Sequence, residues 1–149
     1  MKPKALNEVV MDFPSVSRNE GFARGAAACF AAQLDPTLNE LEDIKTAVSE
    51  AVTNAIVHAY PENIGKVRLR LRILPDGVLE VSVRDWGRGI PDVEKARQPM
   101  FTTGGEGRSG MGFTIMESFT DRLSVRSVPG RGTSVVMRKK LSVRMGGGR

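Results

Sequence analysis

The sequence predicts a single α+β domain built as a two-layer sandwich, with three main helices on one face of a mixed, mostly antiparallel sheet. Two periodicities lead to this prediction. In the first half, apolar residues recur at three-and-four spacing over residues 38–60, as on one face of a helix. In the second half, apolar and polar residues alternate over residues 66–74 and 78–84, as in strands with one buried face. The 149 residues have the length of one domain, 1–149, and contain no obvious linker.

The composition is that of a soluble globular protein, with 40% hydrophobic and 26% charged residues. No apolar run approaches the roughly 18 residues that a membrane span needs, and the first residues lack the apolar segment of a signal peptide. We therefore expect no membrane contact and a cytoplasmic location. The single Cys29 excludes an internal disulfide, and we expect it to be a buried small apolar residue.

The net charge of +5 is concentrated near the end of the chain. Residues 121–149 hold eight Arg and Lys and one acid, whereas residues 1–120 hold 14 basic and 16 acidic residues. The excess therefore belongs to the last hairpin and to residues 141–149, which we expect to form a flexible basic tail. Direct nucleic-acid binding is not predicted, because the basic residues of the strands have no interleaved aromatic side chains for base stacking.

The first half of the chain predicts a strand and two helices. Residues 8–13 form a short strand that ends at Pro14, and Ser15 or Ser17 caps a helix that runs to about Leu34. Thr37 and Glu40 have the spacing of a capping box, which predicts the start of the long helix over residues 38–60. The side chains that we expect to face inward from the first helix are Phe22, Ala26, Cys29 and Phe30.

The second half predicts two hairpins and two shorter helices. Residues 66–74 and 78–84 form a hairpin around Pro75-Asp76-Gly77, with the arginines of the first strand on a solvated face. Residues 123–128 and 133–140 form a second hairpin. Helices are expected over residues 92–98 and 113–119, on either side of a glycine-rich stretch.

Three polar residues lie one turn apart on the long helix. At about 100° per residue, Glu50, Asn54 and His58 form a row along the flank of the apolar stripe, where they can line the rim of a cleft. A carboxylate, an amide and an imidazole offer a proton acceptor, a neutral oxygen ligand for a hard cation and a hydrogen-bonding ring. Taken alone, the row is equally compatible with an ordinary polar flank.

Two glycine clusters follow. Asp85, Gly87 and Gly89 form a D-x-G-x-G motif at a strand end, where the carboxylate can accept from an exocyclic amine while the glycines let a flat ring approach the backbone. Such turns are common, so the motif alone is weak. Residues 105–112 are rich in glycine and precede a helix, an arrangement that suits phosphate binding by backbone N–H groups, although it also fits a flexible surface loop. A dinucleotide-binding fold is excluded because no βαβ unit surrounds this loop.

In this order the three motifs resemble the N, G1 and G2 boxes of the Bergerat-type ATP-binding fold that gyrase, histidine kinases and MutL share, the GHKL superfamily. The segments S-E-A-V-T-N-A-I-V-H, A-R-Q-P-M-F-T-T and R-S-G-M-G-F-T-I-M-E resemble, more specifically, the sporulation anti-sigma F factors, which are also protein serine kinases. The resemblance implies an ATP-dependent homodimer that binds a sigma factor and phosphorylates a serine of an anti-anti-sigma partner, with ADP as product.

The resemblance also implies residue roles. Glu50 is the general base, Asn54 the side-chain ligand of Mg²⁺, and Asp85 the partner of the adenine amino group. The residues implied to shape or close the nucleotide site are Gly87, Gly89, Thr133, Gly110, Gly112 and, at the terminal phosphate, Arg108. Arg24 and Glu20 match positions that touch the sigma factor, although their charges equally fit a solvated helix. The segment between Phe101 and Gly110 holds more glycine than we expect of the family.

Three alternatives stay open. A general-stress anti-sigma kinase has the same chemistry and another sigma partner. A detached histidine-kinase catalytic domain is disfavoured, because the only histidine, His58, lies within the N-box helix. A nucleotide-dependent binding module would keep the ATP site and lack transferase activity.

Overall fold

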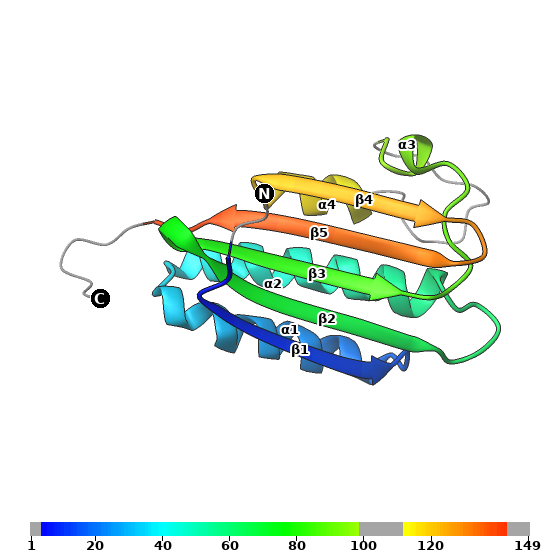
Figure 1. Ribbon diagram of the computed structural model, residues 1–149, viewed down its shortest axis with the longest axis horizontal. Helices are drawn as coiled ribbons and strands as arrows, with labels where there is room; N and C mark the ends of the chain where they lie inside the picture. The colour runs from blue at the N-terminus through cyan, green and yellow to red at the C-terminus, as the bar shows by residue number, and fades with distance from the viewer. Residues whose placement is uncertain (1–3, 99–111, 143–149) are drawn as a thin grey trace.

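The computed structural model describes residues 4–98 and 112–142, which form two layers (Figure 1). One layer is a five-stranded sheet in the order β1-β2-β3-β5-β4. Three helices, α1, α2 and α4, cover one of its faces, and a one-turn helix, α3, lies apart from them (Figure 1). The strands are β1 (Asn7–Pro14), β2 (Lys66–Leu74), β3 (Val78–Asp85), β4 (Arg122–Val128) and β5 (Gly132–Lys140). The helices are α1 (Arg18–Ala31), α2 (Leu38–Thr53), α3 (Val93–Ala96) and α4 (Gly112–Ser118).

The predicted α+β sandwich with three main helices on one face is confirmed. The sheet, expected to be mixed and mostly antiparallel, is antiparallel in all four of its described pairs. The connection between β1 and β2 shows the reason. The chain reverses direction three times along β1, α1, α2 and β2, so β2 runs opposite to β1, whereas a single crossover helix gives two reversals and a parallel pair.

The inward face of α1 differs from the expected one. Its buried residues are alanines and one aromatic, namely Ala23, Ala27, Phe30 and Ala31, whereas the Phe22 side chain is 59% exposed and Cys29 is exposed. The prediction was therefore right for Phe30 and wrong for Phe22, Ala26 and Cys29. From residue 21 to residue 31 every residue except Arg24 is small or apolar, so the periodicity could not fix the rotation of the helix, and the small alanines let α1 pack closely on α2.

The capping box of α2 is confirmed and also anchors the end of the described chain. The Thr37 hydroxyl accepts from the Glu40 backbone N–H at 3.1 Å, and the Thr37 N–H donates to Glu40 Oε1 at 2.9 Å. The other carboxylate oxygen of Glu40 accepts from the Ser142 backbone N–H at 2.9 Å, and Leu141 is buried. The prediction of a flexible tail from residue 141 onward is thus wrong for Leu141 and Ser142; residues 143–149 lie outside the described part.

The long helix ends in a wider turn than its sequence period implies. Residues Asn54–His58 form a π-turn, η2, closed by a hydrogen bond of 3.2 Å from the Ala59 N–H to the Asn54 carbonyl. A π-turn accommodates one more residue than an α-turn, so the row of Glu50 and Asn54 does not continue to His58, which is exposed. The His58 side chain therefore lies off the row that Glu50 and Asn54 form.

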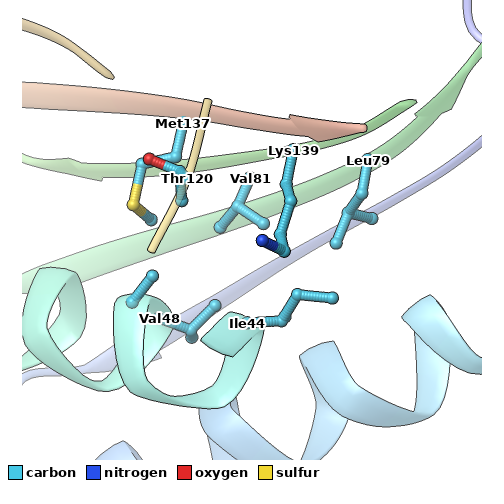
Figure 2. A pocket seen from close by; sticks show the side chains of 8 residues that line it. Ile44, Val48, Leu79, Val81, Thr120, Met137 and Lys139 are labelled. Atoms are coloured by element: carbon cyan, nitrogen blue, oxygen red, sulfur yellow. The ribbon is translucent and has the colours of Figure 1, made fainter. Parts of the chain in front are cut away.

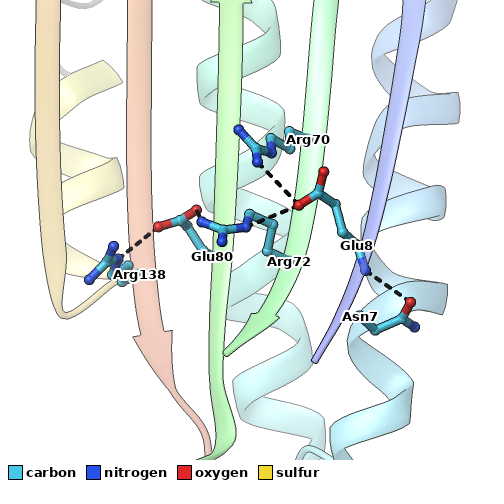
Figure 3. A network of polar contacts seen from close by, with 6 residues as sticks. All are labelled: Asn7, Glu8, Arg70, Arg72, Glu80 and Arg138. Carbon is cyan, nitrogen blue, oxygen red and sulfur yellow. Dashed lines mark hydrogen bonds and ion pairs between the residues drawn. The ribbon is translucent and has the colours of Figure 1, made fainter. Parts of the chain in front are cut away.

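The open face of the sheet is more tightly paired than the predicted solvated arginine ladder (Figure 3). Glu80 of β3 is 5% exposed and accepts from Arg72 of β2 at 2.9 Å and from Arg138 of β5 at 2.8 Å. Glu8 of β1 pairs with Arg70 at 3.1 Å and with Arg72 at 3.2 Å. The chain of ion pairs crosses four strands, so the expectation of a wholly solvated face is wrong for Glu80 and Arg72.

The core lies between the sheet and α2. Alternate residues of β2 and β3 are buried, and Leu69, Leu71 and Leu79 are at most 1% exposed. Figure 2 shows Ile44 and Val48 of α2 pointing toward the strands, with a void of only about 10 Å³ between them. A void this small holds about one water molecule, so it is a packing defect and not a ligand site. Among the described helices none is both long and apolar enough to cross a membrane.

Candidate nucleotide site

Asp85, the last residue of β3, is the buried carboxylate of the site. It is 6% exposed, and its Oδ1 accepts from the backbone N–H groups of Gly87 at 3.0 Å and Thr133 at 3.1 Å. Both bonds go to Oδ1, and Oδ2 accepts no hydrogen bond from the described residues. Burial raises the pKa of Asp85, and the two backbone bonds oppose that rise.

The glycines around Asp85 are places where the backbone has no room for a side chain. A Cβ on Gly87 would lie 2.2 Å from the Ala59 carbonyl oxygen, and one on Gly89, whose φ is +79°, would lie 2.5 Å from the Val128 carbonyl oxygen. Gly132 has φ +123°, and its Cβ would lie 2.2 Å from the carbonyl oxygen of Asp85. The structure thus gives the predicted Gly87 and Gly89 a physical role, and it adds Gly132.

The π-turn connects this loop to the helix that carries Glu50. The Ala59 carbonyl, which follows η2, accepts from the Arg88 N–H at 2.9 Å. Gly87 packs on the same carbonyl. The end of α2 and the end of β3 therefore lie at the same end of the molecule (Figure 1). The contacts of Ala59 thus join the loop after Asp85 to the turn that begins at Asn54.

Glu50 and Asn54 face the beginning of α4. A Cβ on Gly112 would lie 3.5 Å from Glu50 Oε1 and 3.5 Å from both the Oδ1 and Nδ2 of Asn54. Gly112 is therefore in ordinary contact distance of both side chains, and the helix that follows the glycine loop starts against them. Partial burial raises the pKa of Glu50, and the negative charge of Glu20 adds to the effect.

The Asn54 side chain offers a neutral oxygen of the kind that can bind Mg²⁺. Mg²⁺ commonly takes one or two protein oxygens and completes its shell with phosphate oxygens and water. Among residues 4–98 and 112–142 there is no cluster of three or more His, Cys, Asp and Glu that could hold a metal. The side-chain oxygens that meet at the start of α4 are Glu50 Oε1 and Asn54 Oδ1.

Arg24 and Glu20 lie together on α1, close to the Glu50 row. Arg24 Nη1 donates to Glu20 Oε2 at 3.1 Å, and Arg24 lines a hollow that also includes Glu50. The structure therefore brings the two residues that resemble a partner contact next to the residue that resembles a general base. Arg108 and Gly110, predicted at the phosphates, lie outside the described residues.

Several residues of the site were not found from the sequence. Ser127 of β4 accepts from the Ile90 N–H at 2.7 Å and shares a hydrogen bond of 2.8 Å with the Thr133 hydroxyl. The Tyr60 hydroxyl accepts from the Trp86 N–H at 2.7 Å and donates to the Lys66 carbonyl at 2.6 Å. These side chains come from separate segments, so no spacing in the sequence groups them.

Trp86 lies over the end of the sheet. Its ring is covered by Lys66 at 4.5 Å and Arg84 at 4.8 Å from the ring centroid, both in cation–π geometry. The side chain is 37% exposed. These contacts pack the Trp86 ring against basic side chains at the start of β2 and the end of β3.

Comparisons with known proteins show the family to which the chain belongs. A model of the histidine kinase-like ATPase domain matches residues 13–139. The anti-sigma F factor of Caldanaerobacter subterraneus is 57% identical over 134 residues, which cover 89% of this chain and 93% of the relative. The chain belongs to the anti-sigma F factor family of histidine kinase-like ATPase domains.

Other members and neighbours of this anti-sigma F family support the same assignment. The anti-sigma F factor of Bacillus subtilis is 55% identical over 138 residues, covering 91% of this chain and 94% of the relative. A Mycobacterium tuberculosis structure of RsbU and RsbW domains superposes with a TM-score of 0.67 at 19% identity, over 91% of this chain and 32% of that one. At that identity the structural match shows the fold alone. Together with the sequence relatives it confirms the predicted family and fold.

Proposed function

We propose that this protein binds ATP with Mg²⁺ at the end of the sheet, inhibits a sigma factor of the sporulation type, and phosphorylates a serine of an anti-anti-sigma partner. The observation that carries the proposal is the meeting of Glu50, Asn54 and Gly112 in a chain that resembles anti-sigma F factors over about nine-tenths of its length. The family names refer to a sigma factor, and the ATPase domain implies the nucleotide. A homodimer is part of the proposal through the resemblance alone.

Asp85 is the residue that recognises adenine in this proposal. Its free Oδ2 accepts from the exocyclic amine of adenine, while Gly87 and Gly89 leave the backbone open to the ring. Thr133 contributes a hydroxyl held by Ser127 at the same edge. A carboxylate that accepts from an amine distinguishes adenine from guanine, which carries a carbonyl oxygen at that ring position.

Glu50 is the general base for phosphoryl transfer in this proposal. Its carboxylate accepts the proton of the partner serine while that serine oxygen bonds to the γ-phosphorus and the bond from γ-phosphorus to the bridging oxygen breaks, leaving phosphoserine and ADP. The raised pKa of Glu50 suits a base, because a stronger base accepts the proton more readily as long as it stays ionised. Mg²⁺, when bound at Asn54, neutralises phosphate charge.

The test is a transfer assay with labelled ATP, Mg²⁺, this protein and the anti-anti-sigma protein of the same genome. Label on a serine of that partner is the expected result. ATP binding without transfer would contradict the kinase and leave a nucleotide-dependent binding module. A competition between sporulation and general-stress sigma factors for the ATP-bound protein distinguishes a sporulation anti-sigma factor from a general-stress one. Preference for the general-stress factor would overturn the sporulation assignment.

A further inference from the structure

The face of α1 and α2 next to Glu50 is hollowed. A depression of about 330 Å³ lies there, lined by Arg24 of α1 and by Glu42, Lys45, Thr46, Ser49 and Glu50 of α2. All six side chains are polar or charged, so the hollow suits a polar protein segment and not an apolar ligand. Glu50 at its edge places the proposed base within reach of such a segment.

One hydrogen bond ties the two helices together at this hollow. The Ser49 hydroxyl donates to Glu20 Oε2, and Arg24 Nη1 donates to the same oxygen at 3.1 Å. Ser49 directly precedes Glu50 on α2, while Glu20 and Arg24 lie one turn apart on α1. The carboxylate of Glu20 is therefore fixed from one side by the helix of the proposed base and from the other by the arginine.

This arrangement leaves most of Arg24 available. A guanidinium has five N–H donors, and the bond to Glu20 uses one of them. The Arg24 side chain is 42% exposed, whereas that of Glu20 is 24% exposed. The remaining donors keep a fixed direction, since Glu20 holds one arm of the planar group, and a planar fork of this kind binds carboxylates or phosphates in two places at once.

We propose that Ser49 and Glu20 are positioning residues that hold Arg24 as a preset docking point for the protein partner, at a fixed place relative to Glu50. This inference rests on the proposed kinase function. We call the two hydrogen bonds that Ser49 and Arg24 donate to Glu20 the lock. The lock connects the residue before the proposed base to the residue that receives the partner. A partner bound to Arg24 therefore places its serine at one fixed position relative to Glu50. Without the lock Arg24 keeps its charge but samples many rotamers, and each encounter loses side-chain entropy on binding.

The decisive variant is Ser49→Ala, compared with Thr46→Ala. Thr46 lines the same hollow one turn earlier on α2, and its hydroxyl makes no hydrogen bond among the described residues. With the anti-anti-sigma protein as substrate, we expect Ser49→Ala to raise KM by about two- to tenfold, with kcat and ATP affinity nearly unchanged. Thr46→Ala should leave KM as it is. Ser49→Thr, which keeps the hydroxyl, should restore most of the lost affinity.

A second readout needs neither partner nor ATP turnover. The Arg24 Nε–H resonance of the full-length protein reports how rigidly the guanidinium is held, and we expect its order to fall in Ser49→Ala and in Glu20→Gln, but not in Thr46→Ala. A double variant of Ser49→Ala with Arg24→Ala should raise KM no further than Arg24→Ala alone. Equal KM in Ser49→Ala and the wild type, or an unchanged Arg24 signal, overturns the inference even if transfer occurs.

The two proposals fail in different ways. Absence of label transfer from the wild-type protein would overturn the kinase and, with it, the role of the lock in presenting a serine to Glu50. Transfer by the wild type with additive effects of Ser49→Ala and Arg24→Ala would overturn the lock alone.

Discussion

The site has two halves that are built in different ways. The strand-end half comprises Asp85, Gly87, Gly89, Gly132 and Thr133, and it is held by backbone hydrogen bonds and backbone contacts at distances that exclude a Cβ. The helix half comprises Glu50, Asn54 and Gly112, and it is a row of side chains on the flank of a helix whose other face is in the core.

This difference predicts how substitutions in each half of the site will act. In the strand-end half, Gly87, Gly89 and Gly132 let backbone segments touch where a side chain would not fit, so a substitution there changes both the shape and the stability of this region. In the helix half the buried stripe of α2 positions the row, so its polar side chains are free to serve chemistry. Substitutions should therefore affect folding together with binding in the first half and chemistry alone in the second.

The largest expected effect tests the helix half. Glu50→Gln keeps the size of the side chain and removes the proton acceptor, so we expect label transfer to fall by about 10²- to 10⁴-fold, with ATP affinity and thermal unfolding unchanged. Single-turnover transfer and calorimetric titration measure the two quantities. Glu62→Gln, at an exposed position after the end of this helix, is the control and should transfer at the wild-type rate. Wild-type transfer by Glu50→Gln would remove Glu50 from the role of base.

Gly132→Ala tests the strand-end half. Its Cβ would lie 2.2 Å from the Asp85 carbonyl oxygen at φ +123°, so we expect the free energy of unfolding to fall by about 3 kcal/mol. Gly130→Ala is the matched control: φ is +81° but nothing lies within 4 Å, so only the left-handed backbone should cost about 1 kcal/mol. Urea unfolding measures both. Equal losses would show that close approach is unimportant at Gly132.

Asp85→Asn separates binding from folding within the strand-end half. The amide oxygen can still accept from Gly87 and Thr133, whereas the amide nitrogen replaces Oδ2 and opposes the adenine amine. We expect ATP affinity to fall by about 100-fold, while the protein stays folded. Isothermal titration at neutral pH measures the change, and retained affinity would place adenine elsewhere.

Asp85→Asn also tests a predicted pH dependence of the free energy of unfolding. Burial raises the folded-state pKa of Asp85 above its ordinary value of 3.8, so its contribution to stability is fully present below 3.8 and is lost as pH rises through the folded-state pKa. The Asp85→Asn variant has no such loss. The stability of the wild type relative to the variant should therefore decrease from acid toward neutral pH in paired urea titrations, and the opposite slope would contradict the assigned burial effect.

The smallest expected effect concerns the far end of α2, which anchors the helix half. Thr37→Ala removes the capping bond to Glu40 and should cost about 1 kcal/mol of unfolding free energy, without a change in transfer rate or ATP affinity. Ser17 precedes α1 but makes no side-chain capping bond, so Ser17→Ala should cost much less. Equal costs would show that the capping box adds nothing.

By itself the sequence determined the periodic parts of this protein. The stripe of α2, its capping box and the alternation in β2 and β3 are local signals, and the motifs containing Glu50, Asn54 and Asp85 stand at fixed spacings, so a family resemblance could assign them roles. Each of these features is specified within a few neighbouring residues.

Only the tertiary structure decided the rest. The rotation of α1 could not be predicted because most of its residues after Glu20 are small or apolar on every side of the helix, and in the structure Phe22 and Cys29 face outward. Glu80 became buried because Arg72 and Arg138 reach it from strands on either side. The contact of Gly87 with Ala59 and the bond from Ser49 to Glu20 join segments far apart in the chain. Such contacts depend on how elements pack in three dimensions, which no local pattern encodes.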